Sequence, residues 1–291
     1  MSCVTAGGKL LGHEASAEVL AAFQELPLAQ RQPSAGNLPR PDPSQAQVPS
    51  PPAGGIVLKV HGRFLARDGE GLLRHVAGDD FPQLRGKEQE IDYHLFLFEP
   101  NTEYMWLTEK EWKSLVPAEP VQGVKLAVNP AIALRMARFH LSPKRALTSE
   151  DCIVDQREVQ IADVHIIVKE VTPARIRLKL TGFVHHGSNY DAAKATSPNG
   201  PLEFGCETPV HGILEFDRFA QRFVRFDIIA PGDVWGRWGD ANGKSQIIER
   251  PGRTPIGFAF ELATGDSPSN RLPPGGHGGR ALRSGYFTEA Q

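Results

Sequence analysis

The chain has 291 residues, with 32 basic side chains, 34 acidic side chains and a formal net charge of −2. This length accommodates one large domain or two small ones. Because the charges are balanced and scattered, composition gives no support for nucleic-acid binding, which depends on basic surfaces that contact phosphates. Hydrophobic residues at 40% permit a sizeable core, while 29 glycines and 24 prolines indicate many turns and irregular connections.

Membrane and export signals are both missing from the sequence as written. No run of about 18 apolar residues occurs, so we predict no membrane span. The first residues lack the basic and apolar regions of a signal peptide. We therefore expect a cytoplasmic protein, or an exported one if the N-terminus is truncated, because a proline-rich linker suits an exported protein.

The three cysteines, Cys3, Cys152 and Cys206, are too few and odd in number for a disulfide framework. Free thiols in or near the core are the favoured interpretation. A single bridge between Cys152 and Cys206 is the alternative.

The N-terminal region, residues 1–54, is predicted to hold one helix and a tether. Apolar residues in 14–26 recur with helical spacing, and Pro27 ends the pattern. Residues 27–54 contain eight prolines among small and polar residues. Such a segment buries too little apolar surface to offset its ordering entropy, so we expect a disordered, extended tether.

A β-rich domain is predicted over residues 55–264. Strands are expected at 56–66 and 91–98, from their apolar and aromatic patterns. Two short helices should follow. The first is indicated by the capping box of Thr108 and Glu111, and the second by Asn129 and Pro130 as N-cap and first helical residue.

The second helix is expected to bury one stripe of apolar residues and to leave its arginines in water. The stripe consists of Ile132, Met136 and Phe139, and Arg135 and Arg138 are placed outside it.

Residues 156–230 are the clearest strand region, and they predict two β-hairpins in tandem. Apolar and polar residues alternate over 162–168 and 175–180, and Gly182 suggests a bulge or a close backbone approach. Further strands are expected at 210–216, 223–230 and 256–263. The predicted face of the strand at 223–230 contains Val224, Phe226 and Ile228.

Two long connections, 187–208 and 231–254, separate these strands, and the Gly/Pro-rich tail 265–291 is predicted to be irregular. The predicted fold class is therefore β-rich α+β: a mainly antiparallel sheet, as a sandwich or an open barrel, with two or three short helices. Parallel α/β architecture is disfavoured, because long helices do not alternate with the strands.

Antiparallel pairing of these strands would place several chemically active side chains at one sheet edge. His186, His211 and Asp233 should meet there, and imidazole with carboxylate is a ligand set for a transition metal such as Zn or Fe. Against this prediction, no known metal-binding spacing is present. Consecutive strand residues such as His185 and His186 also point to opposite faces.

Trp235, Trp238 and His185 could instead form an aromatic platform for a ligand, although large aromatic residues are mostly buried. The predicted function is therefore a binding module for a small molecule or a protein, using the loop-rich edge formed by 185–211 and 231–254. A metal-dependent enzyme with a His/carboxylate site at that edge is the alternative. The residues alone do not decide between an enzyme and a binding protein.

Overall fold

The computed structural model describes residues 3–4, 10–12, 17–31, 49–80, 100–143, 153–192, 204–236, 252–265, 270, 272–275 and 280–287. The chain divides into two compact units, Met1–Val48 and Pro49–Gln291.

The first unit contains a small antiparallel pair, β1 (Cys3–Val4) and β2 (Leu10–Gly12), followed by α1 (Ala17–Glu25) and α2 (Leu28–Arg31). Helix α1 confirms the predicted helix. Helix α2 lies in the predicted tether, and its sequence Leu-Ala-Gln-Arg consists of strong helix formers. Residues 32–48 of that tether lie outside the described residues.

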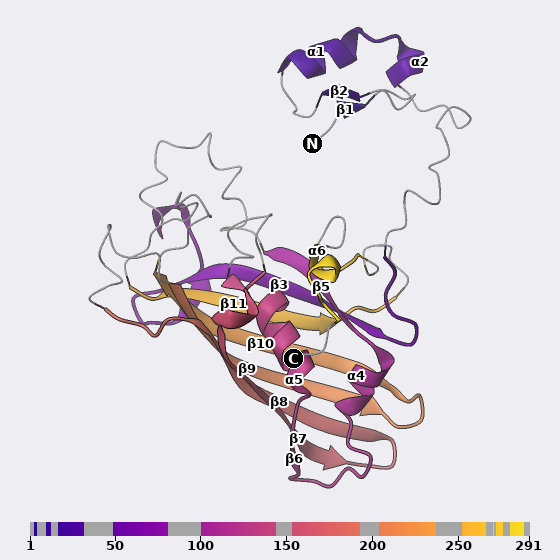
Figure 1. The fold of residues 1–291 in the computed structure, drawn as a ribbon, viewed down its shortest axis with the longest axis vertical. Coiled ribbons are helices and arrows are strands. Elements are labelled where there is room, and N and C mark those ends of the chain that lie inside the picture. The colour runs from indigo at the N-terminus through magenta and orange to yellow at the C-terminus, as the bar shows by residue number, and fades with distance from the viewer. Residues whose placement is uncertain are drawn as a thin grey trace. The chain divides into compact units, whose positions relative to one another are not determined.

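The second unit contains one open, twisted, antiparallel sheet of nine strands (Figure 1). Their order is β4-β3-β11-β10-β9-β8-β7-β6, and β5 pairs with β3. The β-rich α+β fold is confirmed, as a single open sheet rather than two packed sheets among the described strands. The strands are β3 (Ile56–Arg67), β4 (Leu73–His75), β5 (Asn101–Leu107), β6 (Lys125–Ala127), β7 (Val159–Val171), β8 (Arg175–Gly187), β9 (Phe204–Asp217), β10 (Arg222–Gly236) and β11 (Thr254–Leu262).

Two short helical segments lie over one face of this sheet (Figure 1). They are α4 (Glu109–Ser114) and α5 (Pro130–Arg135), which continues as the π-helical turn η4 (Met136–His140). Both predicted caps are present: Thr108 and Glu111 form the capping box, and the Asn129 side chain accepts from the Ala131 amide. Shorter elements are η1 (Gly78–Asp80), η6 (Gln156–Glu158) and α6 (Arg280–Arg283).

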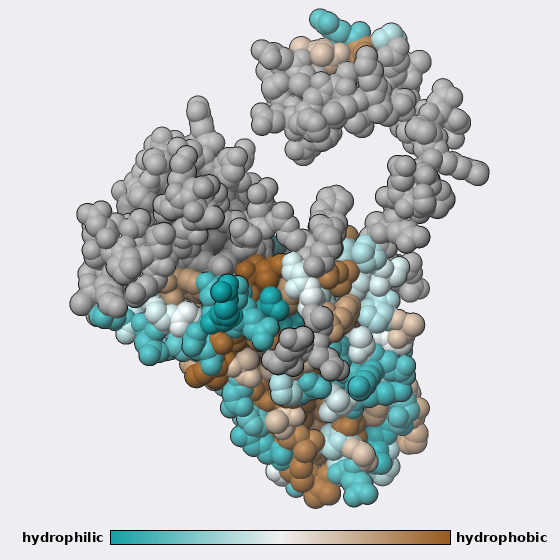
Figure 2. Space-filling model, in the orientation of Figure 1, coloured by the Kyte–Doolittle hydropathy of each residue, from teal (hydrophilic) through white to brown (hydrophobic). Residues whose placement is uncertain are grey.

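The core lies between these helices and the sheet, and strand alternation determines which residues enter it. Ile176, Leu178 and Leu180 of β8 are buried as predicted, while the residues between them are exposed. Figure 2, which shows the helix-bearing side, has apolar and hydrophilic residues interspersed over its coloured surface. Among the described residues, no helix combines the length and the apolar character needed to cross a bilayer.

The buried face predicted for the strand at 223–230, which is β10, is wrong at the first residues of the strand. A bulge between Phe223 and Arg225 inserts an extra residue into β10. Phe223 is consequently buried, and Val224, which was predicted to share a face with Phe226 and Ile228, is 39% exposed. A bulge of this kind reverses the side-chain alternation on one side of it, which a strict period of two cannot anticipate.

Glycines explain why several strands extend beyond their predicted ends. A Cβ atom at Gly182 would lie 2.5 Å from the Asp163 carbonyl oxygen, which confirms the predicted close approach. A Cβ atom at Gly232 would lie 2.4 Å from the Glu207 carbonyl oxygen. Both β9 and β10 therefore run into segments that were predicted to be loops, because glycines there permit close strand pairing.

The remaining differences concern strands and segments without strong local patterns. Strand β5 begins with polar residues and was not predicted, and the predicted strand 91–98 lies outside the described residues. The predicted irregular tail contains α6 and two buried residues, Ala281 and Tyr286. These residues pack with Trp106 and Phe139, so the packed structure continues beyond residue 264.

Candidate functional site

The loop-rich edge of the sheet carries a cluster of charged residues that neutralise one another. His185, Glu207 and Asp233 lie opposite one another on β8, β9 and β10. The Arg253 guanidinium lies 2.6 Å from a Glu207 carboxylate oxygen and 3.3 Å from one of Asp233, and Arg67 lies 3.2 Å from Asp233. Both carboxylates are therefore committed to arginine.

Arg253 is also held between aromatic rings. Its guanidinium carbon lies 4.9 Å from the centre of the Trp235 ring and 5.4 Å from that of Tyr190. Partial burial lowers the pKa of Arg253, but Glu207 and Asp233 together raise this pKa above its ordinary value. The arginine consequently stays charged and ties β11 to its neighbours.

The predicted aromatic platform is part of this packing and does not form an open surface. Trp235 is buried, and its indole lies over Gly205, where a Cβ atom would be 2.4 Å away. His185 is also buried; its Nε2 lies 3.3 Å from the Ser188 carbonyl oxygen, and its ring is 6.2 Å from Trp235. Trp238 lies outside the described residues.

The three predicted metal ligands are not brought together by the sheet. His186 is fully buried, and its Nε2 lies 3.1 Å from the Ala137 carbonyl oxygen, so it faces the helices. His186 lies opposite Cys206 on β9, whereas Asp233 lies opposite the next residue, Glu207. Because consecutive strand residues point to opposite faces, Asp233 lies on the face away from His186. His211 shares that other face but is four residues from Glu207, a separation of about 13 Å along the strand.

Ligands of one metal must lie within a few ångströms of one another. Within the described ranges, no three His, Cys, Asp or Glu side chains are grouped closely enough to hold a metal ion. The sequence predicts correctly which strands are neighbours. The face on which each side chain lies, however, changes when the register shifts by a single residue.

Cys206 lies opposite His186 in the core, as a free thiol. Cys152, its partner in the alternative of a single bridge, lies outside the described residues. Burial raises the pKa of this thiol to about 12, and the thiolate is the reactive form.

We predict that Cys206 in a Cys3→Ser/Cys152→Ser protein does not react with a thiol reagent at mildly alkaline pH while the chain is folded. Unfolding in denaturant should release one reactive thiol. Time-resolved absorbance of an aromatic disulfide reagent measures both states. Rapid, stoichiometric labelling of the folded protein would contradict the prediction.

A groove of about 840 Å³ opens on the outer face of the sheet, the face of β7–β10 that carries Lys179, His211, Ile213 and Ile229. Ile213 is 44% exposed and Ile229 is 59% exposed, on neighbouring strands. Ile213 lies opposite Lys179 on β8, and Ile229 lies opposite His211 on β9. The remaining residues that line the groove are Lys169, Glu170, Arg177, Leu178, Gly212, Arg225, Asp227 and Ile228.

The acidic residues of the groove are paired with arginines, and its two lysines have no ion pair among the described residues. Arg177 lies 3.1 Å from Glu170, and Arg225 is paired with Asp227. Neither Lys169 nor Lys179 has an ion pair with any residue in the described part of the chain. The groove therefore combines exposed apolar side chains with uncompensated positive charge.

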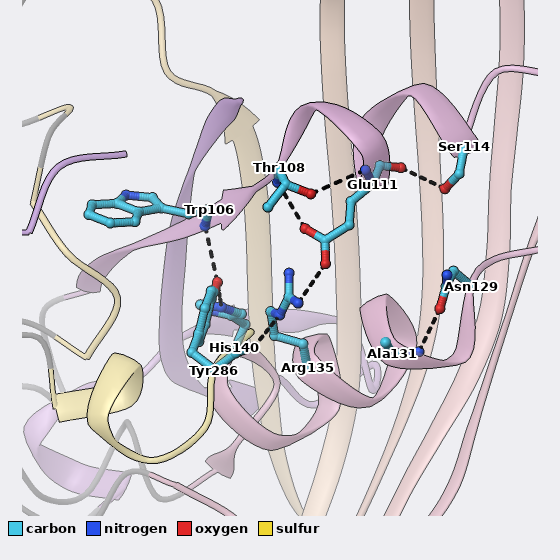
Figure 3. Close-up of polar contacts among 9 residues, drawn as sticks. All are labelled: Trp106, Thr108, Glu111, Ser114, Asn129, Ala131, Arg135, His140 and Tyr286. Atoms are coloured by element: carbon cyan, nitrogen blue, oxygen red, sulfur yellow. Dashed lines mark hydrogen bonds and ion pairs between the residues drawn. The ribbon is translucent and has the colours of Figure 1, made fainter. Parts of the chain in front are cut away.

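A buried polar network lies on the helix-bearing side (Figure 3). His140 Nδ1 is 2.6 Å from a Glu103 carboxylate oxygen, and His140 Nε2 is 2.7 Å from the Tyr286 hydroxyl. The Trp106 amide donates to that hydroxyl at 3.0 Å, and the Glu103 carboxylate accepts from His140 Nδ1. Because all three side chains are buried, the network connects β5, η4 and the C-terminal segment and presents no reacting group to solvent.

Arg135 belongs to the same region, and its predicted exposure is wrong. The side chain is 3% exposed, between Glu111 and the Tyr286 carbonyl oxygen (Figure 3). A signal was present in the sequence, because Arg135 follows Ile132 by three residues and so lies beside it on a helix.

The predicted site residues are thus distributed over three places. His211 lines the groove; His185, Asp233 and Trp235 lie in the edge cluster; and His186 lies in the core. The groove, which the sequence did not predict as a site, is the open concave surface among them. No protein-family model, no curated protein and no solved structure matches the chain.

Proposed function

We propose that the protein is a binding module that holds an amphipathic small molecule in the outer-face groove. The volume of this groove, about 840 Å³, lies within the range of roughly 300–1,000 Å³ that is usual for ligand pockets. The proposal retains the predicted class of binding module. It moves the site from the loop-rich edge to the middle of the sheet.

The exposed isoleucines are the observation that carries this proposal. Single exposed apolar residues are common on proteins and need no explanation. Ile213 and Ile229, however, lie on adjacent strands and both line one concave surface. Because Ile213 and Ile229 are 44% and 59% exposed, covering both would contribute roughly 1.5–3 kcal/mol, about the value of burying one isoleucine fully.

The edge cluster is less suited to an incoming ligand. Arg253, Glu207 and Asp233 already satisfy one another, and Trp235 is covered. A ligand bound there would have to break a charge-assisted hydrogen bond before it formed a new one. The groove instead offers exposed apolar surface and two lysines that have no ion pair with any described residue.

The proposal can be tested with protein labelled at isoleucine methyl groups and titrated with decyl-chain probes: 1-decanol, decanoate and decyltrimethylammonium. We expect saturable shifts of the Ile213 and Ile229 methyl signals, assigned through Ile213→Val and Ile229→Val. Ile161, which is 41% exposed outside the groove, is the matched control and should not shift.

An Ile213→Ser variant should weaken binding about three- to tenfold, because it removes the apolar contact of a side chain that is 44% exposed before binding. Ile161→Ser should leave the affinity unchanged. If none of the three probes produces a saturable shift at Ile213 and Ile229, the groove is not a ligand site and the proposal fails.

A further inference from the structure

We infer that the ligand of this groove is an anionic amphiphile, an alkyl chain that ends in an acidic group such as a carboxylate, held by Lys169 and Lys179. The inference rests on the proposed function and adds the chemical class of the ligand. It follows from the charges that line the groove and from their distribution over the strands.

The charges do not balance within the groove. Four cationic side chains line it, against two carboxylates. Arg177 and Arg225 are paired with those carboxylates, and Arg177 also lies 3.2 Å from Glu215 beside the groove. The positive charge that remains belongs to Lys169 and Lys179, so the groove is electrostatically complementary to one or two negative charges.

The unpaired lysines and the exposed isoleucines of the groove occupy different strands. Lys169 is on β7 and Lys179 is on β8, while Ile213 is on β9 and Ile229 is on β10. Neighbouring strands lie about 4.8 Å apart, so roughly 10 Å separate the Lys179 strand from the Ile229 strand. An amphiphile that lies across the strands would place its acidic group at β7–β8 and its chain over the isoleucines.

The register supports this orientation. Lys179 lies opposite Ile213, and Ile213 lies opposite Asp227 on β10. Lys179, Ile213 and Asp227 thus form a row across β8, β9 and β10. At the β10 end of this row, Arg225 is paired with Asp227 and is not available to an acidic group of the ligand. A cationic head group would meet Lys169 and Lys179 at one end, and a neutral one would leave both ammonium groups without a counter-charge.

The experiment compares the three decyl probes below their micelle concentrations, by calorimetric titration of the full-length chain near neutral pH. We expect decanoate to bind more tightly than 1-decanol, and decyltrimethylammonium to bind most weakly. Raising the salt concentration from about 0.05 to about 0.5 M should weaken decanoate binding only, because salt screens exposed charges.

The matched variants are Lys169→Gln/Lys179→Gln and Lys125→Gln, the last an exposed lysine of β6 outside the groove. An exposed ion pair contributes about 1.4- to fivefold in affinity, so loss of two should cost about two- to twenty-fivefold for decanoate and nothing for 1-decanol. Lys125→Gln should behave as the unmodified chain, and unchanged thermal midpoints would show that all variants fold.

Two results would overturn the inference while leaving the proposed function intact. One is equal affinity of the unmodified protein for decanoate and 1-decanol, with the Ile213 and Ile229 signals shifted by both. The other is unchanged decanoate affinity in the double lysine variant. Failure of every probe to shift those signals would instead remove the proposed function itself.

Discussion

Replacing Arg135 by methionine is expected to lower the free energy of unfolding by about 3–5 kcal/mol, the usual cost of breaking a buried ion pair. Arg135 Nη2 donates to Glu111 at 2.6 Å, and its Nε donates to the Tyr286 carbonyl oxygen at 2.6 Å. The guanidinium also lies 4.8 Å from the centre of the Tyr286 ring. Methionine retains most of the volume, so the loss reports the polar contacts and not a cavity.

The effect should depend on pH through Glu111. Burial alone would raise the pKa of this carboxyl, but Arg135 and the Thr108 amide outweigh burial and lower it. A carboxyl whose pKa is lower in the folded state stabilises that state above its unfolded pKa, and this stabilisation is lost as the pH falls through the folded pKa. The difference between the two proteins should therefore be largest near neutral pH and should shrink below about pH 4.

Urea unfolding followed by circular dichroism, at neutral and at acidic pH, measures this difference. Arg157→Met is the matched control, since Arg157 pairs with Asp155 on the surface and its side chain is 89% exposed. Its effect should stay within about 0.5 kcal/mol. A loss below about 1 kcal/mol for Arg135→Met would show that the buried pair does not contribute as the geometry indicates.

Local patterns predicted most of the sheet, because strands with one buried face alternate with a period of two. The alternation over 175–180 places Ile176, Leu178 and Leu180 in the core, and the observed register pairs β8 with β9 and β9 with β10 as expected. Capping chemistry was equally reliable at Thr108 and Asn129, since the residues that satisfy a helix terminus lie within three positions of it.

The candidate site was harder to predict, because it depends on register and on contacts distant in sequence. His185 and His186 are adjacent in sequence but lie on opposite faces: His186 faces the helices, and His185 lies on the same face as Asp233. A register shift of one residue exchanges the two faces of a strand and leaves no trace in the local sequence. The groove depends on which exposed residues of four strands become neighbours, and only the folded sheet defines them.

The buried network shows the same limit. Glu103 and His140 are 37 residues apart, and His140 and Tyr286 are 146 residues apart. No periodicity within a helix or strand connects positions at such separations. The tail was predicted to be irregular because its Gly/Pro content is high, whereas two of its residues, Ala281 and Tyr286, pack in the core.

Tyr286→Ala is expected to destabilise the protein by about 3–5 kcal/mol, as large aromatic truncations in cores do. Tyr286 is fully buried, and its ring packs at 5.1 Å from the centre of Phe139. The control is Phe219→Ala, on a turn where the side chain is 79% exposed, and it should be nearly neutral. A Tyr286→Ala protein within about 1 kcal/mol of the unmodified chain would show that the C-terminal segment is not part of the cooperative unit.

Tyr286→Phe separates the hydroxyl from the ring. The ring and its packing remain, but the Trp106 amide loses its acceptor and His140 Nε2 loses its hydrogen bond with the hydroxyl. Leaving buried polar groups without this partner should cost about 1–3 kcal/mol, well below the loss for Tyr286→Ala. If denaturant titrations gave equal losses for the two variants, the hydroxyl would account for the whole effect, and packing of the ring would contribute nothing measurable.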